Sequence, residues 1–205
     1  LGLEQEGGLH ICLSQAEFDS RKESLDLLRS HQNGRFSYEM LDRKALLDMQ
    51  PDLGPDVVGG SWCPHDGHVN PLYLLRSLHD CLLKKGSSVI VDAKVSAITY
   101  QQSLFDVTST QGRFYAPRLI LAAGLGNRTL APMVGLEQPI RPQKGHILVT
   151  QKTDKLIKLP MTQLRQTAEG SIMIGDSKEE VGFDISSSAD VTAQIASRAQ
   201  RTLPA

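Results

Sequence analysis

The chain has 205 residues, and its 22 Lys and Arg against 23 Asp and Glu leave a net charge of −1. This length predicts one or two domains with room for a sizeable hydrophobic core. A net charge near zero favours neither nucleic acid nor an anionic membrane as a partner. The longest apolar run, residues 119–123, is far too short to cross a bilayer.

The three cysteines, Cys12, Cys63 and Cys81, form no CxxC pair. An odd, sparse set of cysteines argues against a disulfide framework and indicates a reducing, cytoplasmic compartment. We expect all three to be small buried hydrophobic residues rather than reactive thiols or metal ligands. The chain starts at Leu1 instead of Met and enters a strand pattern almost at once. We therefore expect it to be an interior piece of a longer protein.

The first third of the chain predicts strands alternating with helices. Residues 9–13 alternate apolar and polar, which is typical of a half-buried strand. Ser14 and Glu17 form a capping box at the start of a helix that Asn33 and Gly34 end. The next predicted elements are a short strand at 36–40, a helix at 43–49 capped by Asp42, and a strand within 57–62.

The middle third predicts one helix and several strands. Asn70 caps a helix with Pro71 at its first position, a stripe of leucines and a stop at Gly86. A strand at 89–99 and a hairpin at 104–109 and 113–116 follow. Residues 119–124 are apolar on both faces, which predicts a buried strand in a helix-covered parallel sheet.

The last third predicts short strands and one final helix. The strands lie at 147–150 and 171–174, and the helix starts at Ser188 or Asp190. Glu179 and Glu180 are expected to be exposed turn charges. His65 and His68 flank a turn; a solvated turn is expected there, with a metal site as the alternative.

Two common phosphate-binding motifs are absent, because these residues contain neither GxGxxG nor GxxxxGK[ST]. The end of the predicted strand at 119–124 is the most informative segment. Ala122, Ala123 and Gly124 carry so little side chain that another group can approach the backbone closely. Ligands of α/β sheets bind at the carboxyl ends of strands. A bulky ligand and tight helix–strand packing are both compatible with this segment.

The order of motifs resembles one known family. The motifs are Asp66-Gly-His-Val-Asn-Pro71, a helix ending at Gly86, a strand, a hairpin with Gly112, Leu119–Gly124, Pro142-Gln-Lys-Gly145 and Val181-Gly-Phe-Asp184. This succession is similar to the FAD-dependent D-amino-acid oxidase superfamily, and within it to the branch of glycine oxidase, sarcosine oxidase and D-amino-acid dehydrogenase. The resemblance covers Gly7 to Pro204.

The resemblance implies an α/β (mixed α+β) fold in which part of an FAD-binding, Rossmann-like layer is interleaved with an antiparallel-sheet substrate domain. The implied FAD-binding segment is 65–130, and the implied substrate domain comprises 1–64 and 131–205. Val95 matches the strand valine whose backbone lies beside the adenine of FAD. Ala122, Ala123 and Gly124 match the segment along the ribose and pyrophosphate. The family's N-terminal GxGxxG has no counterpart in this chain.

Lys144 and Gly145 match a basic-glycine pair that begins a substrate-domain strand in this family. Lys144 and His146 are therefore candidates to bind a substrate carboxylate, and a solvated surface lysine is the alternative. No metal ligand and no catalytic nucleophile is assigned.

The resemblance implies an oxidoreductase that oxidises the C–N bond of an amino acid or secondary amine by hydride transfer to flavin. The partners would be that small-molecule substrate and an electron acceptor or a partner subunit. Two alternatives remain: a non-catalytic binding or interaction module that keeps the fold, and a flavin-dependent dehydrogenase of the hydroxy-acid or glycerol-phosphate type.

The 205-residue chain expressed by itself is expected to be colourless. A GxGxxG loop places the pyrophosphate on a helix N-terminus, and this chain lacks that contact. The measurement is the visible absorbance of the purified chain after incubation with FAD and gel filtration. Stoichiometric yellow flavin on the chain would contradict the prediction.

Overall fold

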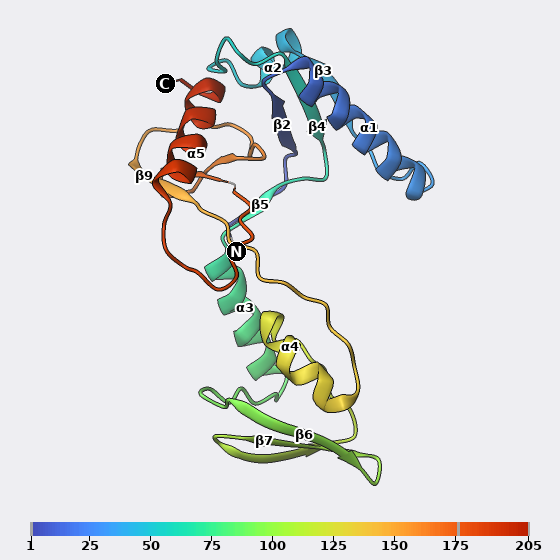
Figure 1. Cartoon of the computed structure of the whole chain (residues 1–205). Coiled ribbons are helices and arrows are strands. Elements are labelled where there is room, and N and C mark those ends of the chain that lie inside the picture. The colour runs from blue at the N-terminus through green and yellow to red at the C-terminus, as the bar shows by residue number, and fades with distance from the viewer. Residues whose placement is uncertain (1, 176, 205) are drawn as a thin grey trace. The chain divides into compact units, whose positions relative to one another are not determined.

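The computed structural model describes residues 2–175 and 177–204. It divides the chain into two compact units (Figure 1). The first unit comprises Leu1–Ser77, Lys144–Glu179 and Ile185–Ala205, and the second comprises Leu78–Gln143 and Glu180–Asp184. Helix α3, Pro71–Lys84, begins in the first unit and ends in the second. No helix in the described ranges combines the length and apolar character needed to span a membrane.

One antiparallel sheet of the first unit has the strand order β2-β4-β3. Its strands are β2 (Gly8–Cys12), β4 (Gly59–Cys63) and β3 (Glu39–Asp42), and helices α1 (Gln15–His31) and α2 (Arg43–Met49) pack on it. The sheet requires glycine at position 60, because a Cβ there would lie 2.1 Å from the carbonyl oxygen of His10. The central strand is therefore in direct backbone contact with β2.

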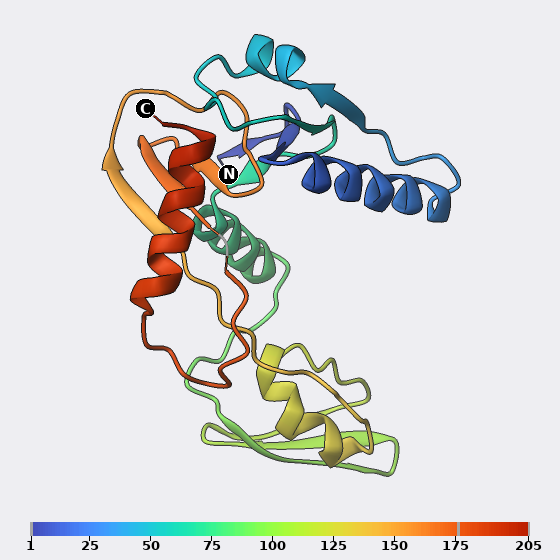
Figure 2. The same ribbon diagram turned by 45° about the horizontal axis from the view of Figure 1, so that its top comes forward.

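A second antiparallel sheet of the first unit has the order β10-β11-β9. Its strands are β10 (Leu164–Gln166), β11 (Ser171–Ile174) and β9 (Leu148–Lys152). Helix α5, Ala189–Thr202, packs against β9 and β11 (Figure 2). The short strands β1 (Leu3–Glu4) and β5 (His68–Val69) form a separate antiparallel pair.

One hydrophobic core joins the two larger sheets of the first unit. Its buried members come from both sheets and from the loops between them: Leu9, Ile11, Leu13, Leu41, Leu46, Leu53, Val57, Ile157, Met161, Leu164, Ile172 and Leu203. Two buried glutamines fix the loop before β10. Gln50 donates to Leu156 O and accepts from Lys158 N, while Gln166 accepts from the amides of Leu156 and Ile157. These bonds satisfy backbone groups that burial would otherwise leave unpaired.

The second unit is built on a three-stranded antiparallel sheet, β6-β7-β8. Its strands are β6 (Val95–Gln101), β7 (Leu104–Ser109) and β8 (Gly112–Ala116). Three short helices follow: η1 (Gly124–Gly126), α4 (Asn127–Leu130) and η2 (Ala131–Val134). β6 packs against α4 and η2 and buries Ile98.

Most predicted elements are confirmed, and the mixed α/β class with them. Ser14 caps α1, Asp42 caps α2, and Ser188 caps α5, each by accepting a backbone N–H. Asn70 Oδ1 accepts from Leu72 N at 3.0 Å, as its predicted role at the start of α3 requires. These caps mark the helix starts that the sequence predicted.

The cysteine prediction holds for two of the three residues. Cys12 and Cys63 are buried as predicted, and burial raises the pKa of both thiols. Cys81 on α3 is exposed, so the prediction was wrong there. The reason is that the whole of α3 lies open within the described structure.

Three strand predictions need correction, and the short strands β1, β5 and β10 were not predicted. Residues 119–123 form no strand, because no described segment pairs with their backbone. Residues 89–94 are likewise irregular, and the strand begins only at Val95. The predicted strand at 36–40 lies instead at Glu39–Asp42 as β3. The sequence showed no sign of β10, whose three residues are too few to show a period.

The leucine stripe of α3 is exposed along its length. Leu72 is 74% exposed, and no residue of the helix is buried. The apolar segment around Ile120 is similarly open, with Ile120 itself 87% exposed. Apolar faces of this size are usually covered by further polypeptide or by a ligand.

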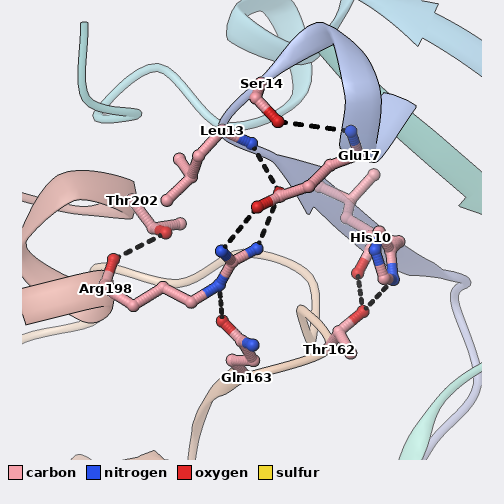
Figure 3. Close-up of polar contacts among 9 residues, drawn as sticks. His10, Leu13, Ser14, Glu17, Thr162, Gln163, Arg198 and Thr202 are labelled. Atoms are coloured by element: carbon pink, nitrogen blue, oxygen red, sulfur yellow. Dashed lines mark hydrogen bonds and ion pairs between the residues drawn. The ribbon is translucent and has the colours of Figure 1, made fainter. Parts of the chain in front are cut away.

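A paired charge links the two ends of the first unit (Figure 3). Arg198 on α5 donates from both terminal nitrogens to the carboxylate of Glu17 on α1, each at 2.9 Å. Glu17 also accepts from Leu13 N at 2.9 Å, and Arg198 Nε donates to Gln163 Oε1. The hydrogen bond from Arg198 is the main cause that lowers the pKa of Glu17 from 4.5 to about 2.

Acid is expected to weaken the first unit through Glu17. The folded state lowers this pKa, so the stabilisation is complete above about pH 4.5 and is lost as the pH falls towards about 2. Because Glu17 and Arg198 are 38% and 30% exposed, the loss should be modest, about 1 kcal/mol. The test is denaturant unfolding at pH 6 and pH 3, in which Glu17→Gln should show a smaller pH dependence than the unchanged chain.

Glu23→Gln provides a matched control on the same helix, since Glu23 is exposed and no ion pair holds it in the described structure. The control should keep the pH dependence of the unchanged chain. Equal pH dependence in Glu17→Gln and Glu23→Gln would contradict the assignment.

Candidate functional site

The predicted cofactor segment lies open in the second unit. Ala122 and Ala123 are exposed, and Gly124 has φ +54° with no atom within 4 Å of the position a Cβ would take. Asn127 holds this segment, since its Oδ1 accepts from Ala123 N and its Nδ2 donates to Leu121 O, both at 3.2 Å. Asn127 was not among the residues predicted from the sequence, although an asparagine three residues beyond a glycine turn is a usual local hydrogen-bonding residue.

Val95 begins β6, which is an edge strand of its sheet. The pairing with β7 shifts register between Val95 and Ala97. Backbone groups along the outer edge of such a strand have no sheet partner and can bind a ligand or another chain. At Gly124 no described atom lies within 4 Å of the position of a Cβ, and at Val95 one edge of the sheet is unpaired, so both places leave room for a further group to approach the backbone.

Lys144 and His146 meet at a carboxylate. Lys144 Nζ lies 3.5 Å from Glu179 Oε2 and donates to Ser186 O at 2.8 Å. His146 Nδ1 lies 3.3 Å from Glu179 Oε1, which also accepts from Ser177 Oγ. The side chains of Lys144, His146 and Glu179 are only 13–15% exposed. Glu179 is therefore a half-buried ionic residue and not the exposed turn charge that the sequence suggested.

This cluster changes how Lys144 can act. Because Glu179 faces the ammonium, Lys144 is not an uncompensated cation that waits for a substrate. Both ring nitrogens of His146 are buried without a partner in hydrogen-bond geometry among the described residues, and the contact at 3.3 Å is one of distance only. That Lys144 and His146 bind substrate stays a prediction.

Arg165, His68 and Glu4 form a further polar group that was not predicted from the sequence. Arg165 on β10 donates to His68 Nδ1 at 3.5 Å, and His68 Nε2 lies 3.2 Å from Glu4 Oε2. His68 is only 15% exposed, so it is not part of a solvated turn as predicted. Glu4 and His68 also line a hollow of about 430 Å³ in the first unit. Within the described ranges, no cluster of three or more His, Cys, Asp or Glu could hold a metal ion.

The sequence matches the family of FAD dependent oxidoreductases (DAO) over residues 1–205, so the chain belongs to that family. It is 40% identical to a subunit of opine oxidase from Agrobacterium tumefaciens (strain Ach5) and 39% identical to the same subunit from Rhizobium meliloti, each over 206 residues. Each alignment covers 100% of this chain and 56% of the relative. The chain thus spans about half the length of these relatives.

The fold agrees with solved structures of the same family. The structure superposes on glycine oxidase from Geobacillus kaustophilus with a TM-score of 0.88 and 22% identity, over 100% of this chain and 56% of that one. L-proline dehydrogenase from P. horikoshii gives a TM-score of 0.84 with 17% identity, covering 98% and 57%. The resemblance inferred from the motifs is confirmed, and FAD is the cofactor of this family.

Replacing Gly124 by valine in the full-length protein is expected to abolish flavin retention. A branched side chain would project where the cofactor is expected to approach the backbone, and φ +54° is unfavourable for it. Gly135→Val is the matched control, because Gly135 has φ +75° and equally open space in the same unit. Flavin content is measured against circular dichroism, and we expect about a tenfold loss or more in Gly124→Val alone. Equal flavin content in the two variants would make Gly124 a conformational residue only.

Proposed function

We propose that this chain forms part of a flavoenzyme that oxidises the C–N bond of an amino acid or a secondary amine. One observation carries the proposal: the chain is 40% identical along its whole length to a relative named as a subunit of opine oxidase. An opine is accordingly the first substrate to test. Solved structures below 25% identity support the fold and leave the substrate open.

The two units fit a division of labour. We assign the FAD-binding layer to 65–130 and the substrate domain to 1–64 and 131–205. The open backbone at Val95 and at 122–124 supports the first assignment. The two packed antiparallel sheets with a common core support the second. In a full-length protein, the exposed leucines of α3 would pack against the region that corresponds to the part of the relatives that this chain does not span.

In this proposal bound FAD would supply the two-electron acceptor for the hydride on the carbon that bears the nitrogen, and the proton on that nitrogen would be released to water. The residues of this chain would bind the cofactor and the substrate and orient them. Gly124 leaves room at the backbone, and Asn127 holds the segment in place. The sheet of β9, β10 and β11 would present side chains to the substrate and exclude water. No protein nucleophile is needed, since water would hydrolyse the resulting imine to a carbonyl compound and a free amine or ammonia.

The experiment described below also tests two alternative functions. A partner subunit is part of the proposal, since the 40% identical relative is itself named as a subunit. A non-catalytic subunit that keeps the fold is the first alternative. The second is oxidation of a hydroxy acid or a glycerol phosphate, because L-alpha-glycerophosphate oxidase from Mycoplasma pneumoniae shares the fold with a TM-score of 0.78 at 15% identity.

The test is the visible spectrum of the full-length protein, purified with its partner subunit where one copurifies. We expect a flavin spectrum that an opine or another amine bleaches in the absence of oxygen. Lactate and glycerol 3-phosphate should leave the spectrum unchanged. Bleaching by either of those two alone would refute amine oxidation, and a protein without flavin would support the non-catalytic subunit.

A further inference from the structure

Arg165 lies on the face of the second sheet that points away from the core. It is directly opposite Met173, which in turn is opposite Val149, so the three side chains share one face. The neighbours Leu164, Gln166 and Ile172 are buried and point to the core on the other face. Val149 is 63% exposed. This face therefore combines the cation of Arg165 with apolar side chains and is open at one side.

The guanidinium of Arg165 contacts an imidazole and a thioether. Nη1 donates to His68 Nδ1 at 3.5 Å, and Nη2 lies 2.9 Å from Met173 Sδ. Glu4 and Glu169 line the same small hollow, yet no ion pair joins Arg165 to a carboxylate among the residues that the structure describes. A half-buried guanidinium of this kind retains N–H donors and a positive charge for a further partner.

His68 orients Arg165. The imidazole Nε2 contacts the carboxylate of Glu4 at 3.2 Å, and a proton on this nitrogen leaves Nδ1 to accept from Arg165. Glu4 and His68 are themselves paired across β1 and β5. The chain Glu4–His68–Arg165 thus fixes the guanidinium from behind, which lowers the entropy lost when it binds a ligand.

Lys144, the cation that the sequence favoured, differs in one respect. Its ammonium lies 3.5 Å from the carboxylate of Glu179, which already compensates its charge. Arg165 makes no ion pair with an acid within the described part of the chain, although Glu4 and Glu169 line the same hollow. Of these two cations, Arg165 is therefore better suited to attract an anion.

We propose that Arg165 binds a carboxylate of the substrate, while Met173 and Val149 contact its apolar part. The guanidinium matches a carboxylate with two parallel N–H···O bonds, a geometry that an ammonium cannot offer. This proposal rests on the proposed function in naming the ligand as the substrate. The anion site itself depends only on the residues of the first unit.

The test measures binding as well as turnover. The probe is iminodiacetate, an amine with two carboxylates, and diethylamine is the comparison with a similar skeleton and no carboxylate. Binding to the oxidised, full-length protein is measured by calorimetry without oxygen. We expect Arg165→Met to weaken iminodiacetate binding about tenfold or more, since a charge-assisted pair is among the strong hydrogen bonds. Its affinity for diethylamine and its flavin content should not change.

Two further variants separate binding from folding. Arg165→Lys keeps the charge without the fork and should recover part of the affinity. Arg29→Met removes an exposed arginine of α1 and should bind both probes as the unchanged protein does.

The outcomes distinguish this proposal from the proposed function. Loss of iminodiacetate binding in Arg165→Met supports the anion site even where no amine bleaches the flavin, and only the proposed function then fails. Unchanged binding of iminodiacetate by Arg165→Met with normal flavin overturns the site, as does a failure of the unchanged protein to bind iminodiacetate, glycine and proline. In these last two cases, bleaching of the flavin by an amine would still support the proposed function.

Discussion

The pair of Glu17 and Arg198 connects the parts of the first unit that are furthest apart in the sequence. The two residues are 181 positions apart, yet both terminal nitrogens of the guanidinium reach one carboxylate. The same carboxylate holds the amide of Leu13 at the end of β2, and the same guanidinium holds Gln163 just before β10. One ionic contact therefore links the first helix, the last helix and both sheets. Because both side chains are partly exposed, this ion pair adds little to the free energy of folding. Its main effect is to fix the placement of the two helices and the two sheets.

Buried glutamines do the same inside the unit. Gln50 is 1% exposed and Gln166 is 9% exposed, and between them they satisfy the backbone of the loop at 153–158. This loop lies between β9 and β10 and packs against the core, so the two glutamines fix the position of β10. The position of Arg165 on the opposite face follows from this placement, because strand residues alternate between the two faces. Strand β10 therefore contributes one face to the core and the other face to the candidate site.

The second unit has a different character. It buries few of its described side chains and leaves the backbone of an edge strand and of the 122–124 segment open. Its apolar residues around Ile120 and on α3 from Leu78 onward are exposed. These features agree with a chain that spans about half the length of its 40% identical relative. A strand pattern at 119–124 without a partner strand remains irregular, since the hydrogen bonds that define a strand come from its neighbour.

Local structure could be predicted from the residues alone. Caps at Ser14, Asp42, Asn70 and Ser188 act within three residues, so the helices that they begin follow directly from the sequence. The order of short motifs was enough to find the family, because spacing along a chain survives where individual residues do not. Which charges meet was settled by the tertiary structure. Glu179 faces Lys144 from a distant part of the chain, and Arg165 contacts His68 across 97 positions. Such contacts depend on how the strands pair and which face each side chain takes, and neither is encoded in a local pattern.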